Sequence, residues 1–194
     1  GLRPETLSDD TLFVGIENDP ITARVASALY PNQAIRCVDF DKASLPADFD
    51  LAIGNPPFSN LTVQNRTELG KLGLSLHDYF IAKSLEHLRP GGIALFVTSR
   101  YSLDKSDAKA RRHIDGIADF LGAVRLPGKA MREEAGTDVV VDILLFQKHG
   151  LDTLYRPSNW IDLGEVPDSD EGEGPLRINR YFLDHPDHVL GRHE

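Results

Sequence analysis

The stretch Asp50-Leu51-Ala52-Ile53-Gly54 continues directly into Asn55-Pro56-Pro57-Phe58, and this junction is the most informative part of the sequence for the fold. Its first five residues form a short apolar run of the kind found in buried parallel strands. The two prolines cannot continue a strand, because each fixes φ near −65° and lacks an N–H donor. We therefore expect a strand that ends at Gly54 and a rigid turn that holds Asn55 at its carboxyl end.

Strand-like and helix-like segments alternate on both sides of this junction. Strands are expected at residues 11–16, 34–38, 50–54, 93–98, 121–126 and 139–146. Helices are expected after Asp19-Pro20, after the capping-box pattern Ser75-Leu76-His77-Asp78, and over residues 107–117. The alternation predicts an α/β, Rossmann-like fold with a mostly parallel sheet. No helix is expected between the last two strands, which favours an antiparallel strand at the sheet edge.

Length and composition indicate one globular domain with an appendage. The chain has 194 residues, of which 41% are hydrophobic and 26% charged. We expect a catalytic domain over residues 1–149 and an acidic, turn-rich extension over 150–194, which Trp160 anchors to the core. There is no apolar run of the roughly 18 residues that a membrane span needs and no pattern of a signal peptide, so a cytoplasmic location is expected. The single cysteine, Cys37, is expected to be a small buried residue.

Polar residues follow three successive expected strands at the point where each ends. Glu17, Asp39 and Asn55 occupy these positions. The carboxyl ends of parallel strands meet at one edge, where open α/β sheets bind ligands, so all three are expected to line one rim. A carboxylate there can accept hydrogen bonds from both hydroxyls of a ribose. For either acid taken alone, a solvated strand end or a helix cap is the simpler interpretation.

The tetrapeptide Asn55-Pro56-Pro57-Phe58 suits methyl transfer to an amino group on a planar ring. Such a nitrogen is a poor nucleophile, because its lone pair is delocalised into the ring. The side-chain oxygen of Asn55 and the carbonyl of Pro56 together can accept both amino hydrogens and so localise that lone pair. Phe58 offers a face on which a flipped base can stack. The alternative interpretation is a rigid turn that only closes a strand.

These residues resemble the class I, Rossmann-like amino-methyltransferases, whose motif is Asp/Asn/Ser-Pro-Pro-aromatic. More narrowly, the chain is similar to the N-6 adenine DNA methylase regions of very large bacterial, plasmid and phage proteins that also carry a helicase-like ATPase. The similar segments are Gly15–Asp19, Ser75–Leu85, Arg89–Gly92, Leu121–Pro127, Ala135–Asp138 and Ile178–Phe182. The resemblance therefore extends over nearly the whole chain, although only the tetrapeptide identifies the chemistry.

The resemblance implies an adenine-specific DNA methyltransferase of a restriction-modification or mobile-element protein, with S-adenosylmethionine as the cofactor. Glu17 would bind the cofactor ribose and Asp39 the cofactor adenine, with Asn18, Phe40 and Asn55 beside them. The implied partners are DNA, with the target adenine flipped out, and a helicase-like ATPase region of the same polypeptide. Neither a membrane nor a metal ion is implied, and the seven histidines show no spacing of a zinc site.

The sequence departs from this group in two respects. The glycine-rich loop that follows the family's first strand is not found before Gly15, so we expect the first strand and this loop to be missing from the chain. We accordingly expect the isolated chain to bind S-adenosylmethionine weakly or not at all. The residues after the last expected strand show no obvious pattern of a target-recognition domain, so we infer no preferred DNA sequence.

Two other functions stay open. One is methylation of another planar amino group, such as guanine in ribosomal RNA or a glutamine side chain. The phenyl ring of Phe58, in place of a tyrosine, argues weakly against glutamine. The other is a methylase-like module that binds DNA or supports a neighbouring ATPase without catalysis. The intact tetrapeptide speaks against this second function.

The net charge of −9 means that contact with DNA needs local basic patches. The expected helix at 107–117 and its start carry one such patch, in which Lys109, Arg111 and Arg112 are the candidates for contact with the DNA backbone. A solvated helix face is the alternative interpretation. The loop region with Arg125, Lys129 and Arg132 is a second, weaker candidate.

Overall fold

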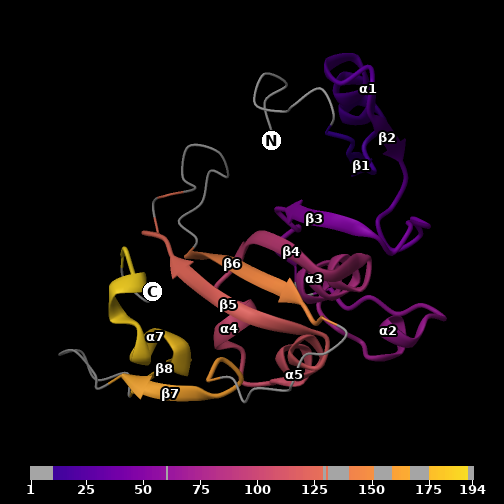
Figure 1. The fold of residues 1–194 in the computed structure, drawn as a ribbon. Coiled ribbons are helices and arrows are strands. Elements are labelled where there is room, and N and C mark those ends of the chain that lie inside the picture. Colours follow the sequence, from indigo (N-terminus) through magenta and orange to yellow (C-terminus); the bar gives the residue numbers. More distant parts are fainter. Residues whose placement is uncertain are drawn as a thin grey trace. The chain divides into compact units, whose positions relative to one another are not determined.

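The computed structural model describes residues 11–59, 61–128, 130, 140–150, 159–166 and 175–191. Its contacts divide the chain between Leu45 and Pro46 into two units, and each is described by itself. The first unit contains β1 (Val14–Glu17), α1 (Pro20–Leu29) and β2 (Ala34–Cys37) (Figure 1). The second contains β3 (Phe49–Gly54), α2 (Glu68–Lys71), α3 (Leu76–Glu86), β4 (Leu88–Ser99), α4 (Tyr101–Asp104), α5 (Lys109–Asp115), β5 (Ala118–Arg125), β6 (Val141–Lys148), β7 (Leu163–Val166), β8 (Leu176–Asn179), α7 (Arg180–Asp184) and the 3₁₀ helix η2 (Pro186–His188). No helix in this described part is long and apolar enough to span a membrane.

The first unit has the strand–helix–strand order that the sequence predicts. β1 and β2 pair in parallel, with Glu17 opposite Cys37. Asp19 caps α1, because its side chain accepts the backbone N–H of Thr22 at 2.7 Å, and Pro20 is the first helical residue. The predicted start of this helix is therefore confirmed. Since the two strands run the same way, their carboxyl ends lie at one edge of the small sheet.

The second unit has a four-stranded sheet in the order β3-β4-β6-β5. β3 and β4 pair in parallel, whereas β6 runs antiparallel to both β4 and β5. The predicted antiparallel pairing of the last two strands is confirmed. The prediction of an antiparallel edge strand is wrong, because β6 lies inside the sheet and the edge strand β5 runs in the direction of β4. β6 pairs with β4 along Ile93–Ser99, a long-range contact that the local pattern does not reveal.

One face of this sheet is buried beneath α3 and α5, which pack against β4 and β5 (Figure 1). The side chains on this face alternate with those of the other face and are all less than 5% exposed: Ala94, Phe96, Ala123, Leu144 and Phe146. Burial of each large apolar side chain contributes about 1.5–3 kcal/mol to folding. This layer therefore forms the main core of the second unit.

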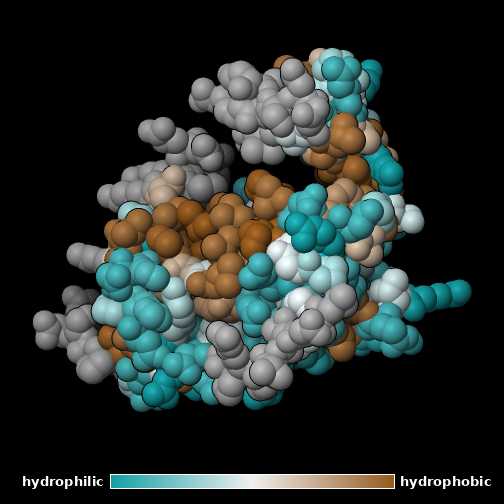
Figure 2. Space-filling model, in the orientation of Figure 1, coloured by the Kyte–Doolittle hydropathy of each residue, from teal (hydrophilic) through white to brown (hydrophobic). Residues whose placement is uncertain are grey.

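The opposite face of the same sheet is apolar but less covered. Leu51 and Ile53 on β3 are 51% and 52% exposed. The strand register places half-buried neighbours beside them, namely Ile93, Leu95, Val97, Ile143 and Leu145. Figure 2 shows apolar residues gathered over the strands of this sheet. Within the described residues, β3 pairs with β4 alone, so the backbone of its other edge is unpaired.

The described residues beyond 149 fold onto the second unit. β7 and β8 form an antiparallel pair, which is followed by α7 and η2. Trp160 is 1% exposed, donates its indole N–H to Asp115 at 3.0 Å, and stacks on Phe120 with 4.8 Å between ring centroids. The predicted role of Trp160 as an anchor is thus confirmed. The domain boundary at residue 149 stays a prediction. The sequence did not predict the short elements after it, because strands of four residues carry little periodic signal.

The start of α3 differs in detail from the predicted capping box. Ser75 is the N-cap residue, but its side chain makes no hydrogen bond to the helix backbone. Instead, its hydroxyl donates to Oδ2 of Asp78 at 2.5 Å and lies 3.2 Å from Nε2 of His77. All three residues are buried, and burial raises the pKa of Asp78. A carboxyl group thus sits inside the core at this helix end.

Candidate active site

Two acidic residues lie at the carboxyl edge of the sheet in the first unit. Glu17 is the last residue of β1, and Asp39 follows the end of β2 by two positions. The side chain of Glu17 is half-buried, and its Oε1 accepts the backbone N–H of Asp19 at 2.9 Å. Among the described residues, none donates a hydrogen bond to its second oxygen. That oxygen is available to the hydroxyl groups of a ligand.

Asp39 forms an ion pair with Lys42 at the surface, and this contact holds the pKa of Asp39 below its ordinary value. The side chain of Asn18 also hydrogen-bonds to Asp39 and lowers its pKa to a smaller extent. Exposed ion pairs contribute little to stability, because water screens the two charges, so an amino group of a ligand can replace Lys42. Phe40 follows directly and is half-buried. Together with Glu17, these residues provide hydrogen-bond acceptors and an apolar surface at the carboxyl edge of the small sheet.

The tetrapeptide Asn55-Pro56-Pro57-Phe58 directly follows β3 in the second unit. Pro56 is buried, whereas Asn55 and Pro57 are exposed and Phe58 is 37% exposed. No hydrogen bond joins the side chain of Asn55 to another residue in the described part of the chain. The buried proline therefore anchors the turn, and the amide and the phenyl ring face solvent, where a ligand can reach them.

Gly54 explains why the turn begins where it does. A Cβ atom added to this glycine would lie 3.3 Å from the ring of Phe96 on β4, a contact tighter than side chains normally make. Phe96 is only 2% exposed, so its ring has little room to move away. The glycine allows the end of β3 to lie close against this ring. Core packing thereby fixes the strand end from which the tetrapeptide starts.

The predicted site residues are thus divided between the two units. Glu17, Asn18, Asp39 and Phe40 belong to the first unit and Asn55–Phe58 to the second. Within its own unit, each set follows the carboxyl ends of parallel strands. The prediction that all of them line one rim stays a prediction.

The basic patch predicted on α5 separates into exposed and buried side chains. Lys109 and Arg112 are exposed, and Nζ of Lys109 donates to the carbonyl of Leu72 at 2.8 Å. Arg111 is only 2% exposed and donates from Nε to the carbonyl of Ile161 at 2.8 Å. Burial lowers the pKa of Arg111. This side chain holds α5 to the segment before β7, so only Lys109 and Arg112 of the three predicted residues have exposed side chains.

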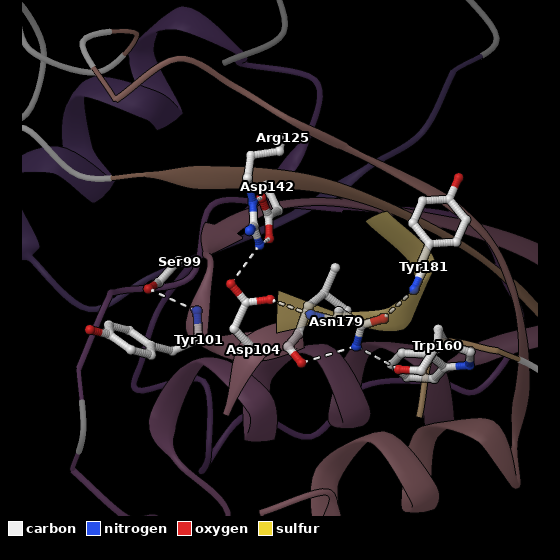
Figure 3. A network of polar contacts seen from close by, with 9 residues as sticks. Ser99, Tyr101, Asp104, Arg125, Asp142, Trp160, Asn179 and Tyr181 are labelled. Atoms are coloured by element: carbon white, nitrogen blue, oxygen red, sulfur yellow. Dashed lines mark hydrogen bonds and ion pairs between the residues drawn. The ribbon is translucent and has the colours of Figure 1, made fainter. Parts of the chain in front are cut away.

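Arg125 is a structural residue, and the prediction that it approaches DNA is wrong. Its side chain is fully buried and forms two 2.8 Å hydrogen bonds with the carboxylate of Asp142. It also lies 2.9 Å from a carboxylate oxygen of Asp104 (Figure 3). The expected strand over 121–126 already contains Arg125, but the sequence does not show that Asp142 lies opposite it on β6 and holds its guanidinium inside. Lys129 and Arg132 lie outside the described residues.

Two exposed arginines were missed in the sequence. Arg177 on β8 and Arg180 at the start of α7 line a surface pocket of about 390 Å³, together with Arg112. The only local signal is that Arg177 alternates with the buried Ile178. An alternation over four residues is too short to predict a strand face.

Two smaller predictions concern metal ions and the single cysteine. Among the described residues, no group of three or more His, Cys, Asp or Glu side chains is placed to hold a metal ion. Cys37 is free and exposed, so the prediction of a buried side chain is wrong. It lies at the carboxyl end of β2, and its Sγ is 3.9 Å from the carbonyl oxygen of Asn18.

Comparison with known proteins finds similarity in structure alone. No protein-family model matches the chain, and no curated protein matches it in sequence. The type I restriction enzyme EcoKI M protein (EC 2.1.1.72) matches with a TM-score of 0.60 and 21% identity, over 91% of this chain and 40% of that protein. A putative class I S-adenosylmethionine-dependent methyltransferase from Listeria monocytogenes matches with a TM-score of 0.59 and 19% identity, over 75% and 47% of the two chains. A modification subunit of a putative type I restriction enzyme from Vibrio vulnificus YJ016 matches with a TM-score of 0.56 and 18% identity, over 71% and 32%.

These matches extend over less than half of each similar protein. Their sequence identities of 18–21% establish a shared fold and leave activity and substrate open. The mixed sheet, with β6 antiparallel between β4 and β5, agrees with this similarity. The chain has the fold of class I S-adenosylmethionine-dependent methyltransferases.

Proposed function

We propose that this chain is the catalytic part of an S-adenosylmethionine-dependent methyltransferase that acts on the exocyclic amino group of adenine in DNA. The observation that carries the proposal is the exposed Asn55-Pro56-Pro57-Phe58 at the carboxyl end of β3, in a chain with a methyltransferase fold. Two of the similar structures are modification proteins of type I restriction enzymes, which supports DNA as the substrate. We extend the proposal to a restriction-modification or mobile-element protein, with a helicase-like ATPase region as a partner.

The tetrapeptide supplies the base-binding half of the proposed site. The side-chain oxygen of Asn55 accepts one hydrogen of the adenine amino group, and the backbone carbonyl of Pro56 accepts the other. Both contacts strengthen as the nitrogen becomes tetrahedral, so they lower the barrier and do more than hold the base. Pro57 lacks an N–H that would compete for these acceptors. Phe58 stacks on the flipped base.

The first unit carries the residues that we propose for cofactor binding. When bound, S-adenosylmethionine provides an electrophilic methyl group on a sulfonium sulfur. The free oxygen of Glu17 suits the ribose hydroxyls, and the exposed carboxylate of Asp39 suits the adenine amino group. Asn18 and Phe40 lie next to these acids. The residues therefore fit the nucleoside end of this cofactor.

The residues of the chain need only align and desolvate the reacting atoms. With the cofactor bound, Asn55 and Pro56 would present the nitrogen lone pair to the methyl group, which the cofactor would supply by losing its bond to sulfur. The nitrogen then carries a positive charge and releases a proton to water. No charged general base is required, in agreement with the absence of ionisable side chains from the tetrapeptide itself.

The test measures transfer of a labelled methyl group to duplex DNA by the full-length protein and its Asn55→Ala variant. Loss of the amide removes one of the two acceptors, so we expect the rate to fall about 100-fold or more. Asn32→Ala, at an exposed asparagine in the turn after α1, is the matched control and should keep the full rate. A duplex whose adenines are replaced by purine, which lacks the amino group, should take up no label. Transfer to RNA alone, or an unchanged rate in Asn55→Ala, would contradict the proposal.

A further inference from the structure

We propose that the surface pocket between α5 and the β8–α7 segment binds phosphate groups of the DNA backbone. The inference rests on the proposed function, because it takes DNA as the substrate. The pocket has a volume of about 390 Å³, and four arginines line it: Arg111, Arg112, Arg177 and Arg180. Asp162 is the one acidic residue of the lining. This concentration of guanidinium groups is unusual on a chain with a net charge of −9.

The positive charge of the pocket comes from its three exposed arginines. Arg111 is buried and donates to the carbonyl of Ile161, so it adds little to the exposed charge of the pocket. Within the described part of the chain, no ion pair engages the side chains of Arg112, Arg177 or Arg180. Guanidinium groups without a carboxylate partner are available to an anionic ligand. The pocket thus attracts an anion by charges that folding has not neutralised.

The walls of the pocket are joined to one another by hydrogen bonds. Arg111 on α5 donates to the carbonyl of Ile161, and the backbone N–H of Arg180 donates to the carbonyl of Asp162 at 2.9 Å. These two bonds connect α5, the segment before β7, and the start of α7. The arginines are therefore carried by backbone that is already in position, which lowers the entropy lost on binding.

Asn179 fixes the strand end that lies between Arg177 and Arg180. Its side chain is fully buried, donates to the carbonyls of Leu103 and Trp160 at 3.0 and 2.7 Å, and accepts the N–H of Tyr181 at 3.0 Å (Figure 3). Its backbone N–H donates to Asp104 at 2.9 Å. These bonds hold the backbone of Asn179 in place between its exposed neighbours Arg177 and Arg180.

Phosphate is the ligand chemistry that fits this arrangement. The planar guanidinium donates two parallel N–H bonds to the oxygens of a phosphate, which makes arginine the preferred partner of this group. An acidic protein repels DNA over most of its surface and needs a local cluster of cations to hold it. Three exposed arginines from two separate segments provide such a cluster. Arg112 in this cluster belongs to the basic patch predicted on α5, and Arg177 and Arg180 add two further cations.

The test measures binding of a fluorescent 20-base-pair duplex by the full-length protein without S-adenosylmethionine, over a series of salt concentrations. The variant replaces all three arginines: Arg112→Gln, Arg177→Gln and Arg180→Gln. Each lost phosphate contact should reduce the slope of log affinity against log salt by about 0.9, and the affinity at moderate salt should fall roughly tenfold or more. The corresponding lysine variant keeps the charges and should keep most of the slope. Arg24→Gln, at an exposed arginine on α1, is the matched control and should leave the slope unchanged.

The outcomes separate this inference from the proposed function. A weakened slope in the triple variant supports the pocket even if the wild-type protein transfers no methyl group, which would defeat only the proposed function. An unchanged slope in a triple variant with an unchanged circular dichroism spectrum overturns the pocket, even if methyl transfer proceeds. The alternative ligand is a small phosphate compound that is free in solution. A calorimetric titration with inorganic pyrophosphate tests this alternative. Micromolar pyrophosphate binding that the triple variant loses, with unchanged affinity for DNA, would also overturn the assignment to DNA.

Discussion

Two asparagines lie at strand ends in the second unit, and they differ in burial and in the hydrogen bonds of their side chains. Asn179 ends β8, is fully buried, and uses its side chain for three hydrogen bonds. Asn55 follows β3, is exposed, and has no side-chain hydrogen bond to the residues that the structure describes. The same side chain thus supports the fold in one place and is left free for a ligand in the other.

The contrast follows from the energetics of polar groups. A buried amide without hydrogen bonds costs about 1–3 kcal/mol per unsatisfied group, so Asn179 can be buried only because it has its partners. An exposed amide has water as its partner and exchanges it for a ligand with little net penalty. The region around Asn179 and Arg125 is therefore expected to be sensitive in stability, whereas the Asn55 region is expected to be sensitive in activity alone.

The largest effect on stability is expected from Arg125→Met. The substitution leaves Asp142 and Asp104 as buried carboxylates without their cation, and it removes the contact of the guanidinium with Phe182, now 4.3 Å from the ring centroid. Breaking a buried ion pair in this way costs about 3–5 kcal/mol. Urea unfolding at pH 7 measures the loss.

The double variant Arg125→Met, Asp142→Leu tests the cause of that loss. It removes both charges of the main pair, which register places directly opposite each other on β5 and β6. We expect it to be more stable than the single variant, because no fully buried carboxylate is then left without its main partner. A single variant that loses less than about 1 kcal/mol would show that the network is not essential to the fold.

The next largest effect is expected from Asn179→Ala. The shorter side chain leaves the carbonyls of Leu103 and Trp160 and the N–H of Tyr181 without their present partners. The expected loss is about 2–3 kcal/mol, measured by urea unfolding. Asn159→Ala is the matched control, because this asparagine is exposed and makes one long contact to Asp184 at 3.3 Å. Equal losses in the two variants would contradict the distinction between buried and exposed amides.

A smaller effect, dependent on pH, is expected from Asp78→Asn. Burial raises the pKa of Asp78 in the folded protein, so the protonated carboxyl is favoured on folding. The stability that this group contributes is complete below its ordinary pKa of 3.8 and is lost as the pH rises through the raised value. An asparagine at this position does not titrate, so its contribution to stability does not change as the pH rises.

The stability of the variant relative to the wild-type protein should therefore be greater at pH 8 than at pH 4. Urea unfolding across this range measures both curves. Asp48→Asn, at an exposed acid, is the matched control and should follow the wild-type curve. Parallel curves for Asp78→Asn and the wild-type protein would show that burial does not govern this carboxyl.

Features of the fold with a local cause could be predicted from the sequence. The start of α1 was predicted correctly, because Asp19 and Pro20 act within one helical turn. The end of β3 was predicted correctly, because two prolines must stop a strand. The position of β6 between β4 and β5 could not be predicted, since it depends on pairing between residues about fifty positions apart.

The same distinction holds for the candidate sites. The tetrapeptide at Asn55 could be recognised, because its chemistry lies in four adjacent residues. Arg111 and Arg112 are adjacent as well, and the sequence assigned them one role. Arg111 is buried and donates to the carbonyl of Ile161, fifty residues further along, whereas its neighbour Arg112 is exposed. Arg177 and Arg180 likewise form a pocket with Arg112 only through tertiary packing, which no local sequence pattern predicts.

The smallest effect on stability is expected from Asn55→Ala. An exposed amide without a bonding partner among the described residues contributes little to the fold, so the free energy of unfolding should change by less than about 0.5 kcal/mol. The same substitution is expected to reduce methyl transfer about 100-fold or more. Measured beside Asn179→Ala, it should give the reverse pattern, with activity lost and stability kept. A loss of stability as large as that of Asn179→Ala would make Asn55 a structural turn residue and remove the basis of the proposed site.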